Sequence, residues 1–259
     1  MKPSIKIRIV DTLIGFIGFA IVIFIWWYAF QNQKAGTYLI PSPVTTFKKL
    51  TVLFFSGEIF IDLYETLYRM LAGYFLAGIF GISCGLLLGS FPFARKMFDG
   101  TIDFFRSIPV TALYPVFVLI FGIGSNSKIA MIFWASFFII CINTTYGVMQ
   151  TNPIRRKMAQ LYGATWFQIF SRVTFYDSLP HAMVGLRVAL SYALIVSILT
   201  EMFMGSQYGI GAKISESYNL YQIDAMFALI LIAGMLGYFF NIIFVRIEKK
   251  IVGWKFNAD

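Results

Sequence analysis

The sequence is poor in the residues that build most catalytic centres. Only 13% of its 259 residues are charged, and it contains two cysteines and a single histidine, His181. One histidine excludes a metal site built on paired histidines, and both cysteines fall within long apolar stretches, where a thiol packs as a small hydrophobic group. The chain contains neither the nucleotide-binding pattern G-x-x-x-x-G-K-[ST] nor the serine motif G-x-S-x-G. We therefore expect no catalytic residues and no metal site in this chain.

What the sequence does contain is apolar surface. Hydrophobic residues make up 59% of the chain, and the mean hydropathy is +0.76, which is far above the range of soluble domains. Six stretches are long and apolar enough to cross a bilayer. They are Leu13–Phe30, Thr66–Ser90, Thr101–Gly122, Ile129–Met149, Ala182–Met204 and Ala225–Val245. We expect an all-α polytopic membrane protein with six transmembrane helices in a single domain, residues 1–259.

The distribution of positive charge predicts how the chain is oriented. Of the 21 lysine and arginine residues, thirteen fall on one side of these stretches and five on the other. Because positive charge accumulates on the cytoplasmic side, both termini are expected in the cytoplasm. The first stretch is interpreted as a retained span, since its apolar core is long for a signal peptide and Phe30-Gln31-Asn32 offers no small-residue cleavage site. The net charge of +9 follows from this bias, which favours contact with lipid and not with nucleic acid.

One segment, Thr151–Asp177, is too polar to cross a bilayer and too apolar to be a solvated loop; we call it the amphipathic segment. Its apolar residues recur at spacings of three and four, which is typical of a helix with one apolar face. They are Met158, Leu161, Tyr162, Trp166, Ile169, Phe170 and Val173. Asn152-Pro153 resembles a helix start, and Gly163 interrupts the pattern. The segment predicts a bent pair of short cytoplasmic helices on which a partner docks.

Three polar residues within or near the spans are candidates for a solute pathway, because burying such groups in a membrane is costly. They are Arg106, Asn143 and Glu201. Each also has a simpler interpretation. Arg106 could extend its charge to the membrane surface, Asn143 could make an interhelical hydrogen bond, and Glu201 could bind nearby backbone amides.

Small residues recur every fourth position in the second stretch. They are Gly73, Ala77, Gly81, Gly85 and Gly89. Such a row allows a second helix to approach closely. The sequence leaves open whether that helix belongs to the same chain or to another subunit.

The amphipathic segment resembles the cytoplasmic motif of binding-protein-dependent ABC importer permeases, which reads E-A-A, three residues, Gly, nine residues, I-x-L-P. With Gly163 on the family glycine, Lys157-Met158-Ala159 stands at E-A-A and Val173-Thr174-Phe175-Tyr176 at I-x-L-P. Lys157 thus replaces the acid and Tyr176 the proline. Further pieces are similar to the nitrate, sulfonate and taurine branch. They are Ile40-Pro41-Ser42-Pro43, Arg106-Ser107-Ile108-Pro109, Phe121-Gly122-Ile123-Gly124, Gly185-Leu186-Arg187 and Gly209-Ile210-Gly211.

The resemblance implies a permease subunit in the bacterial cytoplasmic (inner) membrane, which passes a small solute such as a nitrate-, sulfonate- or taurine-like anion or a related small organic. It implies a second permease copy, as a homodimer, two cytoplasmic ABC ATPase subunits, and an extracytoplasmic solute-binding protein. ATP and Mg would bind the ATPase, and no cofactor would bind this chain. The residues implied in ATPase coupling are Lys157, Met158, Ala159, Leu161, Tyr162 and Gly163.

Two other functions remain open from the sequence. A single-chain secondary transporter would need coupling-ion ligands at the middle of the membrane. Glu201 lies close to the outer end of its span, and no other acid lies at mid-span. A membrane scaffold that only docks a cytoplasmic partner would not need a polar pathway residue such as Asn143.

Overall fold

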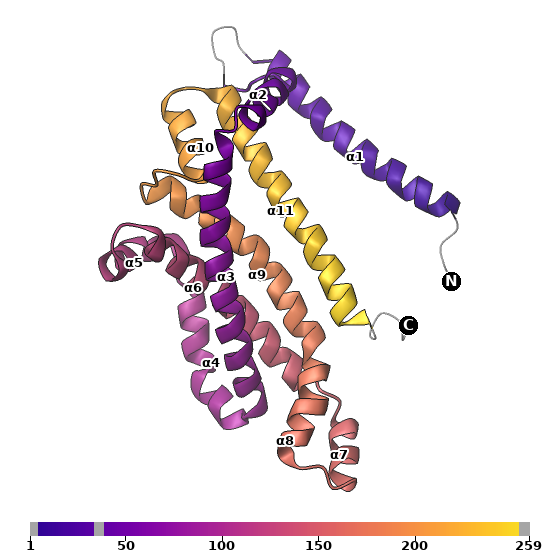
Figure 1. Cartoon of the computed structure of the whole chain (residues 1–259). Coiled ribbons are helices and arrows are strands. Elements are labelled where there is room, and N and C mark those ends of the chain that lie inside the picture. The colour runs from indigo at the N-terminus through magenta and orange to yellow at the C-terminus, as the bar shows by residue number, and fades with distance from the viewer. Residues whose placement is uncertain (1–4, 34–38, 254–259) are drawn as a thin grey trace. The chain divides into compact units, whose positions relative to one another are not determined.

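The computed structural model of the chain describes residues 5–33 and 39–253, with side chains from residue 17 onward. Every regular element in these ranges is helical, as the sequence predicted (Figure 1). The elements are α1 (Ile5–Gln31), α2 (Pro43–Phe55), α3 (Ile59–Ser90), α4 (Pro92–Ser107), η1 (Val110–Leu113), α5 (Tyr114–Phe121), α6 (Ser125–Met149), α7 (Pro153–Leu161), α8 (Trp166–Ile169), η2 (Phe170–Thr174), α9 (Phe175–Phe203), α10 (Ile210–Asn219) and α11 (Ile223–Ile251).

Four helical stretches in the described residues are long and apolar enough to cross a membrane. They are Ile59–Ser90, Ser125–Met149, Trp166–Phe203 and Ile223–Ile251, and each contains most of one predicted span. The part of α1 whose side chains are described, Ile17–Gln31, is a shorter apolar helix. The first predicted span therefore stays a prediction. The two chain ends, whose cytoplasmic location was predicted, lie outside the described residues.

The third predicted span, Thr101–Gly122, is not a straight helix. It is a pair of helices, Pro92–Ser107 and Val110–Phe121, that meet at an angle of 87°. If this bent pair is counted as one span, the number of spans is five. The break has a local cause. Ile108 precedes Pro109 and adopts an extended backbone with ψ of 121°, because a residue before proline is disfavoured in the helical region. For the part of the chain that it describes, the structure thus gives four spans, or five with the bent pair, and the predicted number of six is not confirmed.

The chain divides into two compact units, one made of residues up to Phe60 with Lys213–Ile232 and the other of Ile61–Ala212 with Ala233 onward. In the first unit, α2 begins at Pro43, directly after Ser42. The Ser42 side chain accepts a hydrogen bond from the Thr45 amide at 3.0 Å and caps the helix. The Trp26 indole donates to the Pro41 carbonyl at 3.0 Å, and the Thr45 hydroxyl donates to Asp224 at 2.9 Å.

In the second unit, the row of small residues on α3 packs against α6 of the same chain. A Cβ added to Gly73 would lie 2.7 Å from Ile132, and one added to Gly85 would lie 2.6 Å from the Cys141 carbonyl oxygen. Since these distances are below normal contact, only glycine permits this helix pair. Of the two interpretations left open, the structure thus supports packing within one chain.

Helix α6 also packs along α9, and glycines again allow the close approach. A Cβ on Gly147 of α6 would meet His181 of α9, and a Cβ on Gly185 of α9 would lie 2.7 Å from the Asn143 Cβ. Buried apolar side chains such as Ile132, Ala189 and Ala193 fill the remaining space. Helix α6 is therefore the central element of the second unit, with α3 on one side and α9 on another.

Gly85→Ala is expected to lower the stability of the folded protein by about 1–3 kcal/mol, because the new methyl group would overlap backbone atoms of α6. Gly78→Ala, in the same helix, is the matched control. Its added Cβ would lie 3.6 Å from the nearest atom, of Leu186, an ordinary contact. The measurement is the melting temperature of the detergent-solubilised protein. Equal melting temperatures for the two variants would contradict the α3–α6 packing.

Candidate functional site

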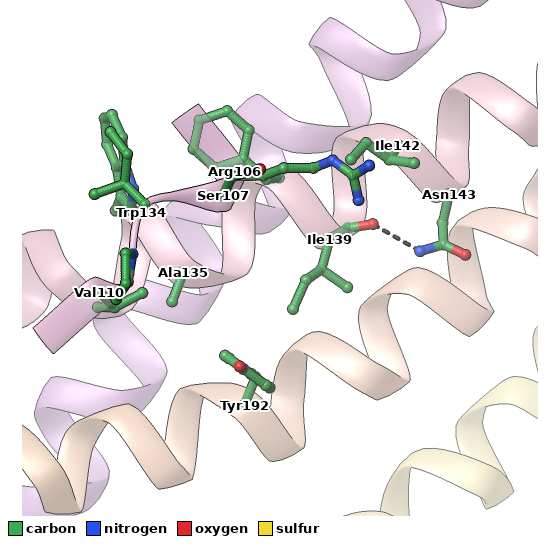
Figure 2. A pocket seen from close by; sticks show the side chains of 12 residues that line it. Arg106, Ser107, Val110, Trp134, Ala135, Ile139, Ile142, Asn143 and Tyr192 are labelled. Carbon is green, nitrogen blue, oxygen red and sulfur yellow. Dashed lines mark hydrogen bonds between the residues drawn. The ribbon is translucent and has the colours of Figure 1, made fainter. Parts of the chain in front are cut away.

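A cavity of about 460 Å³ lies where α4 ends, between the bent pair, α6 and α9 (Figure 2). It brings together two of the three predicted pathway residues, Arg106 and Asn143. The bend allows this arrangement, because it ends α4 at Ser107 and turns the chain toward α6. The remaining walls are mostly apolar, with two hydroxyl-bearing residues, Ser107 of α4 and Tyr192 of α9. They are formed by Ser107, Ile108, Pro109, Val110, Trp134, Ala135, Phe138, Ile139, Ile142 and Tyr192.

Arg106 supplies the positive charge of the cavity. Its Nε donates to the Asp103 carboxylate at 2.8 Å, one turn earlier on α4, and its side chain is 53% exposed. Figure 2 shows the guanidinium group extending along α6 toward Asn143. An arginine has five N–H donors, so the bond through Nε leaves the terminal amino groups for an acceptor in the cavity. The arrangement suits a small anion with several oxygen atoms.

Asn143 lies on α6 opposite Arg106. Its side-chain amide donates to the Ile139 carbonyl at 2.8 Å, which is a bond within its own helix and not the interhelical bond that was one interpretation (Figure 2). The Asn143 side chain packs against Gly185 of α9, where any larger residue would overlap it. Its carbonyl oxygen adds a hydrogen-bond acceptor to a cavity that Arg106 supplies with donors.

Glu201 is not part of this cavity. Its side chain is fully buried and accepts hydrogen bonds from Arg69 Nη1 and from the Thr66 hydroxyl, both at 2.8 Å. It also accepts a bond from the Gly211 amide at 3.0 Å, at the beginning of α10. This matches the simpler interpretation of Glu201 as a carboxylate that binds backbone amides, joined here by a buried arginine. Glu201 connects α3, α9 and α10.

The ion pair belongs to a larger polar cluster that sequence reasoning missed. Asp62 accepts a hydrogen bond from the Gly209 amide at 2.7 Å, and the Ile210 amide donates to the Thr66 hydroxyl at 2.9 Å. The free amides at the start of α10 are thus satisfied by acids and hydroxyls of other helices. A signal was present in the sequence, since Asp62, Thr66 and Arg69 are spaced by four and three residues and share one helix face.

The amphipathic segment has the predicted break at Gly163, but only its first helix, α7, is short, because α8 continues through η2 into α9 as the helical stretch Trp166–Phe203. Asn152 caps α7 by accepting from the Ile154 amide at 2.9 Å. Gly163 has a φ of +77°, a left-handed conformation that favours glycine and ends α7. Thr165 and Gln168 then form a reciprocal capping box that begins α8. Figure 1 shows α7 and α8 together at one end of the second unit.

The apolar stripe of the segment divides into a buried part and an exposed part. Ile169 is buried, and Trp166 stacks on Phe170 with ring centroids 5.5 Å apart. Leu161 and Tyr162, in contrast, are each 87% exposed, and Met158 beside them is 51% exposed. Of the other residues predicted to couple, Lys157 is exposed and Ala159 is half-buried. The end of α7 therefore presents apolar side chains that the described part of the chain leaves uncovered.

Comparisons with known proteins agree with this geometry. The family model described as "Binding-protein-dependent transport system inner membrane component" matches residues 77–253. The chain is 29% identical to the putative aliphatic sulfonates transport permease protein SsuC of Bacillus subtilis (strain 168), over 91% of this chain and 85% of that protein. It is 25% identical to the taurine transport system permease protein TauC of Escherichia coli (strain K12), over 91% and 87%.

A solved structure shares the fold. A chain of the MetNI methionine ABC transporter, in an inward-facing conformation, superposes with a TM-score of 0.65 at 20% identity. The match covers 73% of this chain and 94% of that one. The helical arrangement of most of this chain therefore follows a known fold.

Glu201→Gln is expected to destabilise the protein by about 2–3 kcal/mol, because it removes the buried one of the two carboxylates that pair with Arg69 and leaves only Glu65, at 2.7 Å. Asn143→Ala removes a hydrogen bond within one helix and should cost only about 1 kcal/mol. Thermal unfolding of the two purified variants in detergent checks the difference. A Glu201→Gln protein as stable as the wild type would mean that the ion pair does not hold these helices together.

Proposed function

The chain belongs to the family of binding-protein-dependent transport system inner membrane components, and from that premise we propose which solute it passes and how it engages its partners. It is a multi-pass permease subunit of an ABC importer. The family implies an ATPase and an extracytoplasmic binding protein as partners. The chain therefore acts in transport and has a non-enzymatic role.

We propose that the transported solute is a small organic anion of the sulfonate type, such as taurine or an alkane sulfonate. The relatives named above transport aliphatic sulfonates and taurine. The observation that carries the proposal is the cavity in which Arg106 and Asn143 meet. A sulfonate offers three oxygen acceptors to the guanidinium, and the apolar walls accept its carbon chain.

Arg106→Gln is expected to lower sulfonate uptake at least tenfold, because the cavity loses its positive charge while its size changes little. Arg106→Lys keeps the charge and should retain part of the uptake. The measurement is ATP-driven uptake of a labelled sulfonate by the complete importer in proteoliposomes. Unchanged uptake by Arg106→Gln would exclude the cavity as the anion pathway.

We also propose that the ATPase docks on the exposed end of α7, through Met158, Leu161 and Tyr162. Burying two or three such side chains contributes roughly 3–6 kcal/mol before the cost of association. Gly163 sets the angle between α7 and α8, and Ala159 lies behind the exposed residues. Lys157 stands where the family motif has an acid. We therefore expect the groove of the ATPase that receives α7 to carry an acidic residue that pairs with Lys157.

The assembly proposed here contains two copies of this permease as a homodimer and one ATPase subunit under each amphipathic segment. ATP and Mg bind the ATPases, and closure of the ATPase pair rotates the two segments and alternates access to the pathway. Both chain termini and the segment are proposed to face the cytoplasm, and residues 1–259 to form one permease domain. A secondary transporter is less well supported, since Glu201 is engaged by Arg69 and Thr66.

Replacing both Leu161 and Tyr162 with aspartate is expected to release the ATPase, because two charges would occupy the apolar contact. The chain offers a matched control in Leu220 and Tyr221, a second exposed Leu-Tyr pair, which lies between α10 and α11. The measurement is co-purification of the ATPase with each double variant. Docking on α7 is refuted if the Leu161/Tyr162 variant keeps its ATPase and its ATP-driven uptake.

A further inference from the structure

A second cavity adjoins the cavity described above. It has a volume of about 300 Å³ and is lined mainly by α4 and α6. The two cavities share Arg106 and Ile142. Along α6 they extend from Trp134 to Met149, about 22 Å at 1.5 Å per residue. Together they run from the bent pair to the last turn of α6, immediately before the amphipathic segment.

Helix α4 presents a charged stripe to this second cavity. Arg95, Asp99, Asp103 and Arg106 are spaced by four, four and three residues, so they share one helix face, and all four line the cavity. Asp103 and Arg106 lie within the predicted span, where a charged side chain faces the interior of a helix bundle or a water-filled space, because exposing it to lipid is costly. The stripe therefore marks a polar route along α4, with one arginine at each end.

The two arginines differ in what they contact. Arg106 is paired with Asp103 through Nε at 2.8 Å. Arg95 is half-buried, and its guanidinium makes no ion pair with any side chain described in residues 17–33 and 39–253, although Asp99 lies one turn away on the same face. Arg95 thus has the donors that an anion needs, at the end of the route opposite Arg106.

We propose that the two cavities form one track for an anionic solute and that Arg95 is its second cationic position, reached after Arg106. The proposal rests on the proposed function in one respect, the negative charge of the solute. Two positions are useful because conduction requires binding that is strong enough to admit the solute and weak enough to release it. Asp99 and Asp103 lie between the arginines and limit how tightly an anion is held there.

The test uses a cysteine as a reporter inside the track. Cys84 and Cys141 are replaced by serine, since Cys141 itself lines the second cavity, and Ile142→Cys is introduced where the two cavities meet. The protein in lipid nanodiscs is treated with methanethiosulfonate reagents bearing a sulfonate, a quaternary ammonium or no charge. The thiolate attacks the reagent sulfur, a mixed disulfide forms, and methanesulfinate leaves. The rates are compared in the reporter protein and in its Arg95→Gln, Arg95→Lys and Lys96→Gln variants.

Lys96 is the matched control, because it adjoins Arg95, carries the same charge and does not line the cavity. Arg95→Gln should slow the sulfonate reagent about fivefold, whereas Arg95→Lys and Lys96→Gln should leave its rate unchanged. The uncharged reagent should react equally with all variants, which confirms that the fold is intact. Equal slowing by Arg95→Gln and Lys96→Gln, or no slowing by Arg95→Gln, would overturn the proposal.

The labelling experiment needs no transport, so the two proposals fail separately. If wild-type importer moves no sulfonate but Arg95 still governs the labelling, the sulfonate assignment is wrong and the anion track stands. If uptake depends on Arg106 but the labelling rate does not change when Arg95 is replaced, then Arg95 is not a second cationic position and the proposal for Arg106 stands.

Discussion

The buried ion pair between Arg69 and Glu201 is the interaction on which the second unit depends. A charged side chain inside a membrane protein must find its partner within the protein, and each of these two supplies the other's counter-charge at 2.8 Å. The pair joins α3 to α9, and the same carboxylate accepts the Gly211 amide at the start of α10. Removing Arg69 would leave the Glu201 carboxylate buried without its paired cation, whereas Arg69 also pairs with Glu65 at 2.7 Å. The cluster therefore sets how three helices are placed along one another.

The bend at Pro109 creates a cavity between helices, whereas the ion pair holds helices together. A straight helix through Thr101–Gly122 would carry Arg106 and Asp103 into the hydrocarbon region with no defined polar surroundings. The 87° break ends α4 early and places its charged face against α6. The cost of a broken helix in a membrane is acceptable where the backbone lines a cavity. The cavities along α6 thus exist because one predicted span is interrupted.

Short-range contacts within the amphipathic segment define its conformation, and longer-range contacts attach it to the helices around it, including Trp166 against Phe91 with ring centroids 5.8 Å apart. The Asn152 cap, the left-handed Gly163 and the Thr165–Gln168 capping box are each defined within a few residues of sequence. Beyond them, Arg155 pairs with Asp177 at 2.6 Å and connects α7 to the start of α9. The Arg155 side chain is 64% exposed, so this ion pair adds only a weak attachment.

The sequence by itself determined the helical class, four of the spans and the bent helix pair at Gly163, because hydrophobic periodicity, caps and glycine conformations are local properties. It also indicated Arg106 and Asn143, since polar residues are conspicuous in apolar stretches. It did not determine which polar residues meet. Only the tertiary structure decided that Glu201 pairs with Arg69, 132 positions away, and so supports the fold instead of lining the cavity with Arg106 and Asn143. It likewise decided that the small-residue row of α3 faces α6. Such choices depend on how helices dock in space, where a distance of a few ångströms places the Glu201 carboxylate in the core and the Arg106 guanidinium on the wall of a cavity.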